Sequence, residues 1–401
     1  MRKLSAVPEP QIVFNPKSYT CRRASGVSEW TGRLDQHFWQ QAEWTEDFVD
    51  IEGDRRPIPA KRTRVKMLWD DDYFYIGAEL EDNEIWANQR ERDSVIFQDN
   101  DFEIFIDPDG DTHRYYEFEI NALNTVWDLL LVKPYRDEGP AVNGWDISGL
   151  RTAVYIKGEL NNPLAENVMW SVEIALPWRI LQECSAEQRP PQHGEYWRVN
   201  FSRVEWQVDV VDERYVKRSD PATGKPLPED NWVWSPQGIV NMHYPELWGY
   251  VIFAGNEDDH GMNEQYEEKG TSVSHVQAAQ YTEHIEYNER NKYTKYAESG
   301  TSSAGLDMLS LTPAQLEAEQ TKWKLRQLYY KQRAYAYTHG SYCRDMKELL
   351  EVGELELHLD HAEQLQMEVT SSMFQISAAL SDGRTRLCIR EDGWTWQEEI
   401  I

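Results

Sequence analysis

Two tryptophans that flank a single valine are the first candidates for ligand binding. Trp232 and Trp234 stand on either side of Val233, and side chains two apart on an extended strand point to the same face. Such a pair either offers flat apolar faces to a ligand or fills a core, and the sequence leaves both roles open. The chain has 17 Trp and 21 Tyr against 11 Phe. Rings with a polar group suit half-exposed platforms for polar ligands as well as cores.

A short acidic run, DPDGD, is the candidate for metal binding. Its carboxylates are Asp107, Asp109 and Asp111. An EF-hand calcium loop requires Gly at its sixth position and a bidentate Glu at its twelfth, and this chain has Thr112 and Phe118 there. A hairpin turn is therefore favoured over a calcium loop. Pro presets φ for such a turn and Gly supplies a positive φ.

The charge balance limits the classes of partner. Lys and Arg total 41 against 70 Asp and Glu, a formal net charge of −29. Nucleic-acid binding needs clustered basic residues, and an anionic membrane surface needs the same. Both are disfavoured, whereas a neutral ligand or Ca²⁺ is compatible with the charge. No cofactor is required by any motif.

Short alternating strands dominate residues 60–255. The segment 63–69 alternates, a turn follows, and 73–80 runs back; the runs 101–107 and 115–121 flank the DPDGD turn. Further strands are expected at 126–132, 150–156, 168–175, 196–204 and 248–253. Many short strands separated by turn signals predict an all-β sandwich of immunoglobulin or jelly-roll type.

The composition changes after Phe253. Residues 256–310 are polar and poor in branched aliphatic side chains, which predicts a flexible linker. A helix is expected from Thr312, as N-cap, with Pro313 in its first turn, to a stop at Gly340. Alternating runs at 365–370, 373–380 and 385–390 predict a small antiparallel sheet. Residues 311–401 are thus expected to form an α+β extension.

The expected helix carries apolar residues on two faces. Trp323, Tyr330 and Tyr337 recur every seven residues, and Leu325 and Leu328 form a second stripe. An exposed stripe of this kind promotes aggregation. We therefore expect the helix to dock on the sandwich or to bind a protein partner.

The cysteines and the N-terminus carry little functional information. Cys21, Cys184, Cys343 and Cys388 are scattered without zinc spacing. We expect buried free thiols, with a Cys21–Cys184 bridge as the lesser alternative. No signal peptide and no stretch of transmembrane length is visible, so the compartment stays open.

Six segments in order resemble carbohydrate-binding-module family 9. They include RTRVKMLWDDDYFYIGAELED, DNDFEIFIDPDGD with RYYEFEINALN, and NVMWSVEIALPW; EYWRVNFSRVEW and NWVWSPQGIVNMHYPELWGYVIF follow. The resemblance covers about residues 10–255. It implies a sandwich that holds a terminal sugar between two aromatic side chains, with structural calcium away from the sugar. Members are often secreted or displayed on the cell surface.

The resemblance assigns site residues one by one. It places the first ring of the clamp at Phe97, with Trp86 as a substitute, and the second at Trp232 or Trp234. It places the groups that hold the sugar hydroxyls at Asn200 and at Glu119, where the family has an Arg. Arg203, on the strand of Asn200, either faces the ligand or pairs with a carboxylate, and the pairing is favoured.

The predicted function is non-catalytic binding of a mono- or oligosaccharide, or of a polysaccharide end, as an accessory to glycan degradation or sensing. The first alternative is a glycoside hydrolase or another carbohydrate-active enzyme that uses the same cleft. With 70 acidic residues, any one pair of carboxylates is weak evidence for hydrolysis. The second is a haem-binding redox domain of the related superfamily, with Met242 or His243 as ligand. No Ser-His-Asp elbow, phosphate loop or HExxH helix is present.

Overall fold

The computed structural model describes residues 6–26, 29–255, 310–352 and 365–400. The predicted linker at 256–310 lies outside the described residues except for Ser310. Within the described ranges, no helix is long and apolar enough to cross a membrane.

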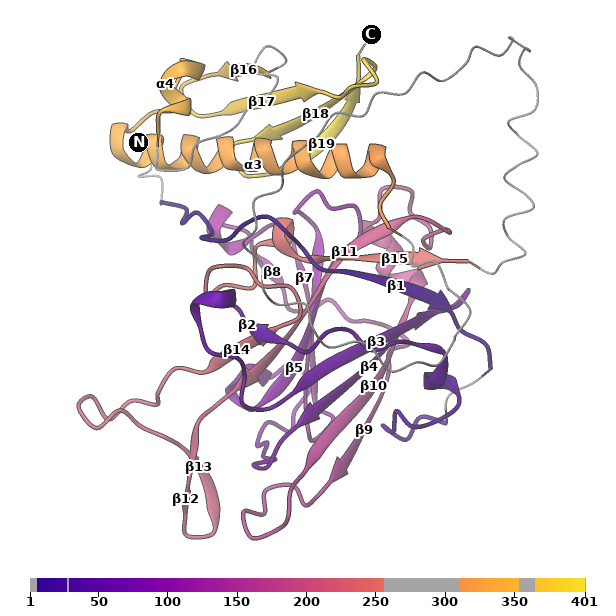
Figure 1. Ribbon diagram of the computed structural model, residues 1–401. Coiled ribbons are helices and arrows are strands. Elements are labelled where there is room, and N and C mark those ends of the chain that lie inside the picture. The colour runs from indigo at the N-terminus through magenta and orange to yellow at the C-terminus, as the bar shows by residue number, and fades with distance from the viewer. Residues whose placement is uncertain (1–5, 27–28, 256–309, 353–364, 401) are drawn as a thin grey trace, which may run out of the picture. The chain divides into compact units, whose positions relative to one another are not determined.

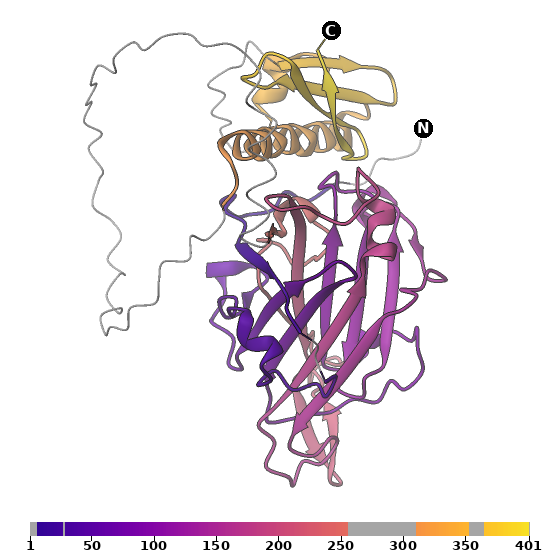
Figure 2. The same ribbon diagram turned by 90° about the vertical axis from the view of Figure 1, so that its right-hand side faces the viewer.

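One hydrogen-bonded sheet of 13 strands curls so that its two halves face each other (Figures 1 and 2). The first half has the order β8-β7-β6-β5-β11-β15, with β14 on β11 and β2 on β14. Its strands are β2 (Val49–Asp50), β5 (Asp101–Asp107), β6 (Tyr115–Asn121), β7 (Val126–Leu131), β8 (Ala141–Val142), β11 (Tyr196–Glu205), β14 (Asp230–Val233) and β15 (Gly249–Ala254).

The second half has the order β3-β4-β10-β9, and strand β1 joins the halves by pairing in parallel with both β15 and β3. Its strands are β1 (Ser18–Arg23), β3 (Thr63–Trp69), β4 (Tyr73–Glu81), β9 (Arg151–Lys157) and β10 (Met169–Pro177). A separate hairpin, β12 (Val208–Val211) with β13 (Arg214–Lys217), and the one-turn helix α1 (Trp178–Leu181) complete this part of the chain.

The core lies between the two halves because alternate side chains of each strand point inward. Met67 of β3 and Ile76 of β4 meet Ile104 of β5 and Phe118 of β6 in one buried cluster. The predicted all-β sandwich is confirmed, and the predicted strands match to within a residue or two at each end. All four cysteines are buried and free, as expected.

The C-terminal residues form the predicted helix and small sheet. Helix α3 (Pro313–His339) begins at the capping box of Thr312 and Gln315 and ends at Gly340, whose φ of 74° is left-handed. A short helix and four antiparallel strands follow in sequence order: α4 (Met346–Leu350), β16 (Leu365–Val369), β17 (Phe374–Ala379), β18 (Thr385–Arg390) and β19 (Thr395–Glu399). Neither α4 nor β19 was expected from the sequence.

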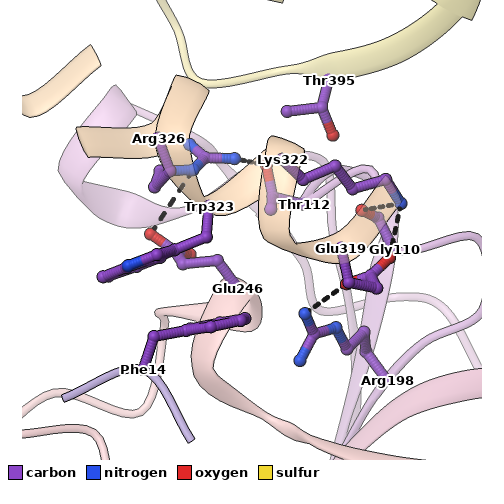
Figure 3. Close-up of a pocket in the computed structure, with 10 residues that line it drawn as sticks. All are labelled: Phe14, Gly110, Thr112, Arg198, Glu246, Glu319, Lys322, Trp323, Arg326 and Thr395. Atoms are coloured by element: carbon purple, nitrogen blue, oxygen red, sulfur yellow. Dashed lines mark hydrogen bonds and ion pairs between the residues drawn. The ribbon is translucent and has the colours of Figure 1, made fainter. Parts of the chain in front are cut away.

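Helix α3 docks on the sandwich through a buried ionic contact around Glu319 (Figure 3). The Glu319 carboxylate forms an ion pair with Arg198 of β11, lies 3.1 Å from Lys322 Nζ and accepts a 2.7 Å hydrogen bond from Tyr196. Burial alone would raise the pKa of Glu319, but the charges of Lys322 and Arg198 lower it to about 2. The carboxylate is therefore ionised at neutral pH. Docking, one of the two expected outcomes for this helix, is confirmed.

Stacking and further polar contacts extend this interface. Trp323 stacks on Phe14, with ring centroids 4.8 Å apart, and Arg326 donates a 3.0 Å hydrogen bond to Thr112. Tyr330 is buried, but Tyr337 is 52% exposed, so the predicted aromatic seam ends before the last turns of the helix. The pocket among these residues holds about 20 Å³, room for one water molecule. It is part of the interface and too small for a ligand.

We predict that Glu319→Ala lowers the free energy of unfolding by about 3–5 kcal/mol, because it leaves Arg198 buried without its carboxylate. Urea unfolding followed by tryptophan fluorescence measures the change. Gln320→Ala, an exposed neighbour on the same helix, is the control and should change the value by less than about 0.5 kcal/mol. Equal stabilities of the two variants would contradict a stabilising role for the ionic contact.

Candidate functional site

Four acidic side chains gather on the face of β5 and β6 that points away from the core between the two halves. Asp101 and Glu103 alternate with Phe102 and Ile104 on β5, and Glu117 and Glu119 alternate with Phe118 and Ile120 on β6. Glu103 pairs directly with Glu119 across the two strands. The four acids, named here the carboxylate cluster, are each at most 6% exposed.

Several polar atoms in the carboxylate cluster lack hydrogen-bond partners. Among the described residues, none donates a hydrogen bond to either oxygen of Asp101 or to Glu117 Oε2. The backbone N–H of Val204 lies close enough to lower the pKa of Asp101 but does not meet hydrogen-bond geometry. Glu119, by contrast, accepts a 3.0 Å hydrogen bond from the backbone N–H of Phe97.

Burial and mutual repulsion both hold protons on these carboxyl groups. Burial raises the pKa of Glu103 to about 7. Burial, followed by the charge of Glu103, raises the pKa values of Asp101, Glu117 and Glu119 well above their usual range. The cluster is therefore partly protonated near neutral pH unless positive charge is brought to it.

Two half-buried aromatic rings lie beside the carboxylate cluster and are named here the aromatic pair. Phe97, in the 3₁₀ turn Ile96–Gln98, stacks on Trp127 of β7 with centroids 6.4 Å apart and planes 27° apart. Trp127 pairs across the strands with Glu119. Its indole Nε1 is buried and has no hydrogen-bond partner in the described part of the chain.

Further rings surround Phe97 and the acids. Trp86 and Trp206 pack in one buried cluster with Phe97, and Trp206 Nε1 donates a 2.8 Å hydrogen bond to the Phe97 carbonyl. Tyr135 is 47% exposed. Burial, with the charges of Glu117 and Glu119, raises its pKa to about 12. The site thus combines flat apolar faces with carboxylate acceptors and an indole donor.

The structure brings together only some of the residues expected at the site. Trp86, Phe97 and Glu119 lie here. Asn200 is wholly buried on β11, where its side chain exchanges hydrogen bonds with the backbone of Ser235 at 2.8 and 2.9 Å. Arg203 forms an ion pair with Glu205 at 2.7 Å, so the favoured pairing with a carboxylate is confirmed.

Trp232 and Trp234 belong to the core between the two halves. Trp234 is wholly buried, and a Cβ added to Gly249 would lie 2.4 Å from its ring. Trp232 is 7% exposed and lies under the Arg203 guanidinium, 5.2 Å from the ring centroid. Neither ring offers a free face, so the expectation of a platform here is corrected: the shared strand face is the inward one.

The DPDGD run forms the favoured hairpin turn between β5 and β6. Asp107 accepts hydrogen bonds from the backbone N–H groups of Gly110 and Thr112 at 3.1 and 2.9 Å, and Asp111 accepts from His113 N–H and Trp394 Nε1. Carboxylate oxygens of Asp107, Asp109 and Asp111 lie within 4.8 Å of one another. Calcium binding by these three residues stays a prediction.

Met242 and His243, the candidates for haem ligation, both contact protein. His243 Nδ1 lies 2.9 Å from the Tyr115 hydroxyl, and its ring packs edge-on against Phe105 and Tyr135. Met242 is buried in the cluster that contains Trp248. These contacts assign both residues to packing.

The sequence reasoning missed Asp101, Glu103, Glu117, Trp127 and Tyr135. The signal for the acids was present, since DFEIFID and YYEFEIN alternate acidic with apolar residues. In an antiparallel sheet such alternation usually indicates one solvated face and one buried face. The structure buries both faces.

Residues 31–140 match the family model described as "Carbohydrate family 9 binding domain-like". The predicted resemblance to family 9 is thereby confirmed for this part of the chain. The matched region contains the whole carboxylate cluster and aromatic pair, whereas Asn200, Arg203, Trp232 and Trp234 lie beyond it.

The chain is similar to several solved structures. One is a carbohydrate-binding module of family 9 from Caldicellulosiruptor kristjanssonii in complex with cellotriose, which is 18% identical with a TM-score of 0.40. The match covers 61% of this chain and 96% of the module. A family 9 module of the same organism in complex with glucose is 16% identical, covering 60% of this chain and 98% of its own, with a TM-score of 0.38. No curated protein matches the chain.

We predict that Trp234→Ala lowers the free energy of unfolding by about 3–5 kcal/mol, the cost of a large cavity in a packed core. Denaturant unfolding monitored by circular dichroism measures it. Trp396→Ala, in the small C-terminal sheet and only partly buried, is the matched control and should cost less than about 1 kcal/mol. If the Trp234 variant were as stable as the control, the assignment of this ring to the core would be wrong and a role in ligand binding would again be open.

Proposed function

We propose that the sandwich is a non-catalytic carbohydrate-binding domain and that a sugar binds at the aromatic pair and the carboxylate cluster. The observation that carries the proposal is a half-buried ring stack whose Trp127 lies directly opposite Glu119 of the carboxylate cluster. Trp127 Nε1 in the stack and Glu117 Oε2 in the cluster are both buried without a partner among the described residues. Both features lie in the region that matches the family 9 model. The domain would act as an accessory to glycan degradation or sensing.

A sugar meets the requirements of both features. Its C–H face stacks on aromatic rings, a contact worth about 0.5–1.5 kcal/mol beyond the buried area. Its hydroxyls donate hydrogen bonds to carboxylates and accept one from the indole N–H. A buried polar atom without a partner costs about 1–3 kcal/mol, and the ligand would remove this cost.

The aromatic contact differs from the clamp that the resemblance implies. Trp232 and Trp234 are buried in the core, so the second ring is assigned to Trp127. Phe97 and Trp127 are nearly parallel at 6.4 Å, too close to hold a sugar ring between them. They would form one platform, with the half-exposed Tyr135 beside it.

Glycoside hydrolysis is the second candidate, and the pKa of Glu103 favours it. A value of about 7 suits a general acid at neutral pH. Binding is preferred because hydrolysis also needs a second, ionised carboxylate, and burial raises the pKa values of Asp101, Glu117 and Glu119 well above their usual range.

We predict that Trp127→Ala weakens sugar binding by about tenfold or more, equivalent to about 1.4 kcal/mol, through loss of the platform. A glycan array that includes cellotriose and glucose identifies the ligand, and calorimetric titration measures the affinity. Tyr337→Ala, an exposed ring on α3, is the control and should leave the affinity unchanged.

Two further measurements separate the candidate functions. Reducing-sugar release from a glycan panel would establish hydrolysis, and a Soret band in the visible spectrum would establish haem. Unchanged affinity of the Trp127 variant for an array-positive sugar would contradict the proposed binding surface.

A further inference from the structure

Three buried carboxylates of the cluster converge closely enough to share one cation. One oxygen from each of Asp101, Glu103 and Glu119 lies within 4.8 Å of the other two. Oxygens this close can bind one divalent cation together. Ca²⁺ accepts 6–8 oxygen ligands in a flexible geometry, whereas Mg²⁺ demands a near-ideal octahedron and keeps several waters, so side chains fixed on two strands suit Ca²⁺ better. We propose that Asp101, Glu103 and Glu119 form a calcium site beneath the aromatic pair.

These acids lack the compensating positive charge that several other buried carboxylates have. Within the described residues, Asp137, Glu205 and Glu319 each form an ion pair with an arginine. No Lys, Arg or His in those ranges forms an ion pair with Asp101, Glu103, Glu117 or Glu119, although each of the four is at most 6% exposed. Burying a carboxylate without a counter-charge costs several kcal/mol, and a bound divalent cation supplies that charge.

Three buried carboxylate oxygens in the cluster have no hydrogen-bond partner among the described residues, and such atoms indicate a missing ligand. Asp101 is wholly buried, and one of its two oxygens without hydrogen bonds is among the three that converge. Glu117, the fourth member of the cluster, contributes a further buried oxygen without a partner. Burial is the largest cause of the raised pKa of Glu119, and the charges of Glu103, Asp101 and Glu117 raise it further, in that order. These are hard oxygen donors of the kind that Ca²⁺ prefers.

In the described part of the chain, two other sets of three carboxylates converge in the same way, but their oxygens have hydrogen-bond or ion-pair partners. Asp107 and Asp111 in the hairpin turn accept backbone and indole N–H groups. Asp128, which lies near Asp93 and Asp146, pairs with Arg92. Protein groups already satisfy both sets, so the hairpin set, where the sequence also predicted calcium, is the alternative site against which the carboxylate cluster is tested.

The remaining ligands of the ion connect this site to the proposed function. Calcium takes 6–8 oxygen ligands, and Ser202, directly opposite Glu103 on β11, offers a buried hydroxyl. Waters or sugar hydroxyls would complete the sphere. If the proposed sugar binding holds, the ion bridges the protein and the sugar, and affinity for the sugar depends on calcium; the cation site itself does not rest on that function.

Calorimetric titration of CaCl₂ into the full chain, freed of metal with EDTA and then of chelator, tests the site. We expect one bound Ca²⁺ per chain, and binding of MgCl₂ at least tenfold weaker. Glu103→Gln, which keeps the shape and removes the charge, should weaken Ca²⁺ binding at least tenfold. The control Asp109→Asn should leave it unchanged.

Thermal melting shows whether the variant folds. In EDTA, Glu103→Gln should melt at or above the wild-type temperature because one repelling charge is gone. Ca²⁺ should raise the melting temperatures of the wild type and of Asp109→Asn but not that of Glu103→Gln. If Glu103→Gln does not fold, Asp101→Asn takes its place with the same expectation. No calcium binding by the wild type, or its loss in Asp109→Asn with full retention in Glu103→Gln, would overturn the proposed site.

A glycan array run in EDTA and in CaCl₂ separates this proposal from the proposed function. Sugar binding that persists in EDTA together with absent calcium binding would refute the cation site alone. Calcium binding at Glu103 without binding of any sugar would refute the proposed function alone.

Discussion

A carboxylate that is removed from water must be neutralised by a proton, a basic side chain or a metal ion. The packing of this molecule depends on how that requirement is met. Where Glu319 of α3 is buried against β11, Arg198 and Lys322 keep it ionised, and the ion pair joins the helix to the sandwich. On β5 and β6 the same burial occurs without a basic neighbour among the described residues, and this difference makes the carboxylate cluster a candidate for binding.

The fold could be predicted largely from local patterns. Alternation of period two fixed the strands 63–69, 101–107 and 115–121, and the Thr312 and Gly340 caps fixed the helix, because each signal is contained in a few neighbouring residues. The elements that were missed depend on distant partners. Strand β1 is held by pairing in parallel with β15, more than 200 residues away in the sequence, and β2 has only two residues, both paired with β14.

The site was harder to predict for a physical reason. An alternating strand in an antiparallel sheet usually has one buried and one solvated face, so acidic residues that alternate with Phe and Ile indicate solvent. Here the second face is also covered, and the pattern gives no sign of it. The same ambiguity misplaced Trp234. The sequence predicts that the two indoles share one face of the strand, but it does not say whether that face points inward. The pairing of Val233 with Ser202 across β14 and β11 decides this, and the composition of the strand does not reveal that pairing.

Glu119 connects the resemblance to the chemistry of the cluster. The resemblance to family 9 implies an arginine at this position, and a guanidinium there would have neutralised Asp101 and Glu103 and donated hydrogen bonds to a sugar. A glutamate reverses the sign of the charge and adds an acceptor where a donor stood. The fold can keep this substitution only if other positive charge or protons enter the cluster, since burial raises the pKa of Glu119 and the charges of Glu103 and Asp101 raise it further. A divalent cation restores the missing charge and, with open coordination positions, can also take over the contact with hydroxyl groups. The loss of a guanidinium that would bind hydroxyls is therefore consistent with the proposed site, in which a metal ion would hold the sugar.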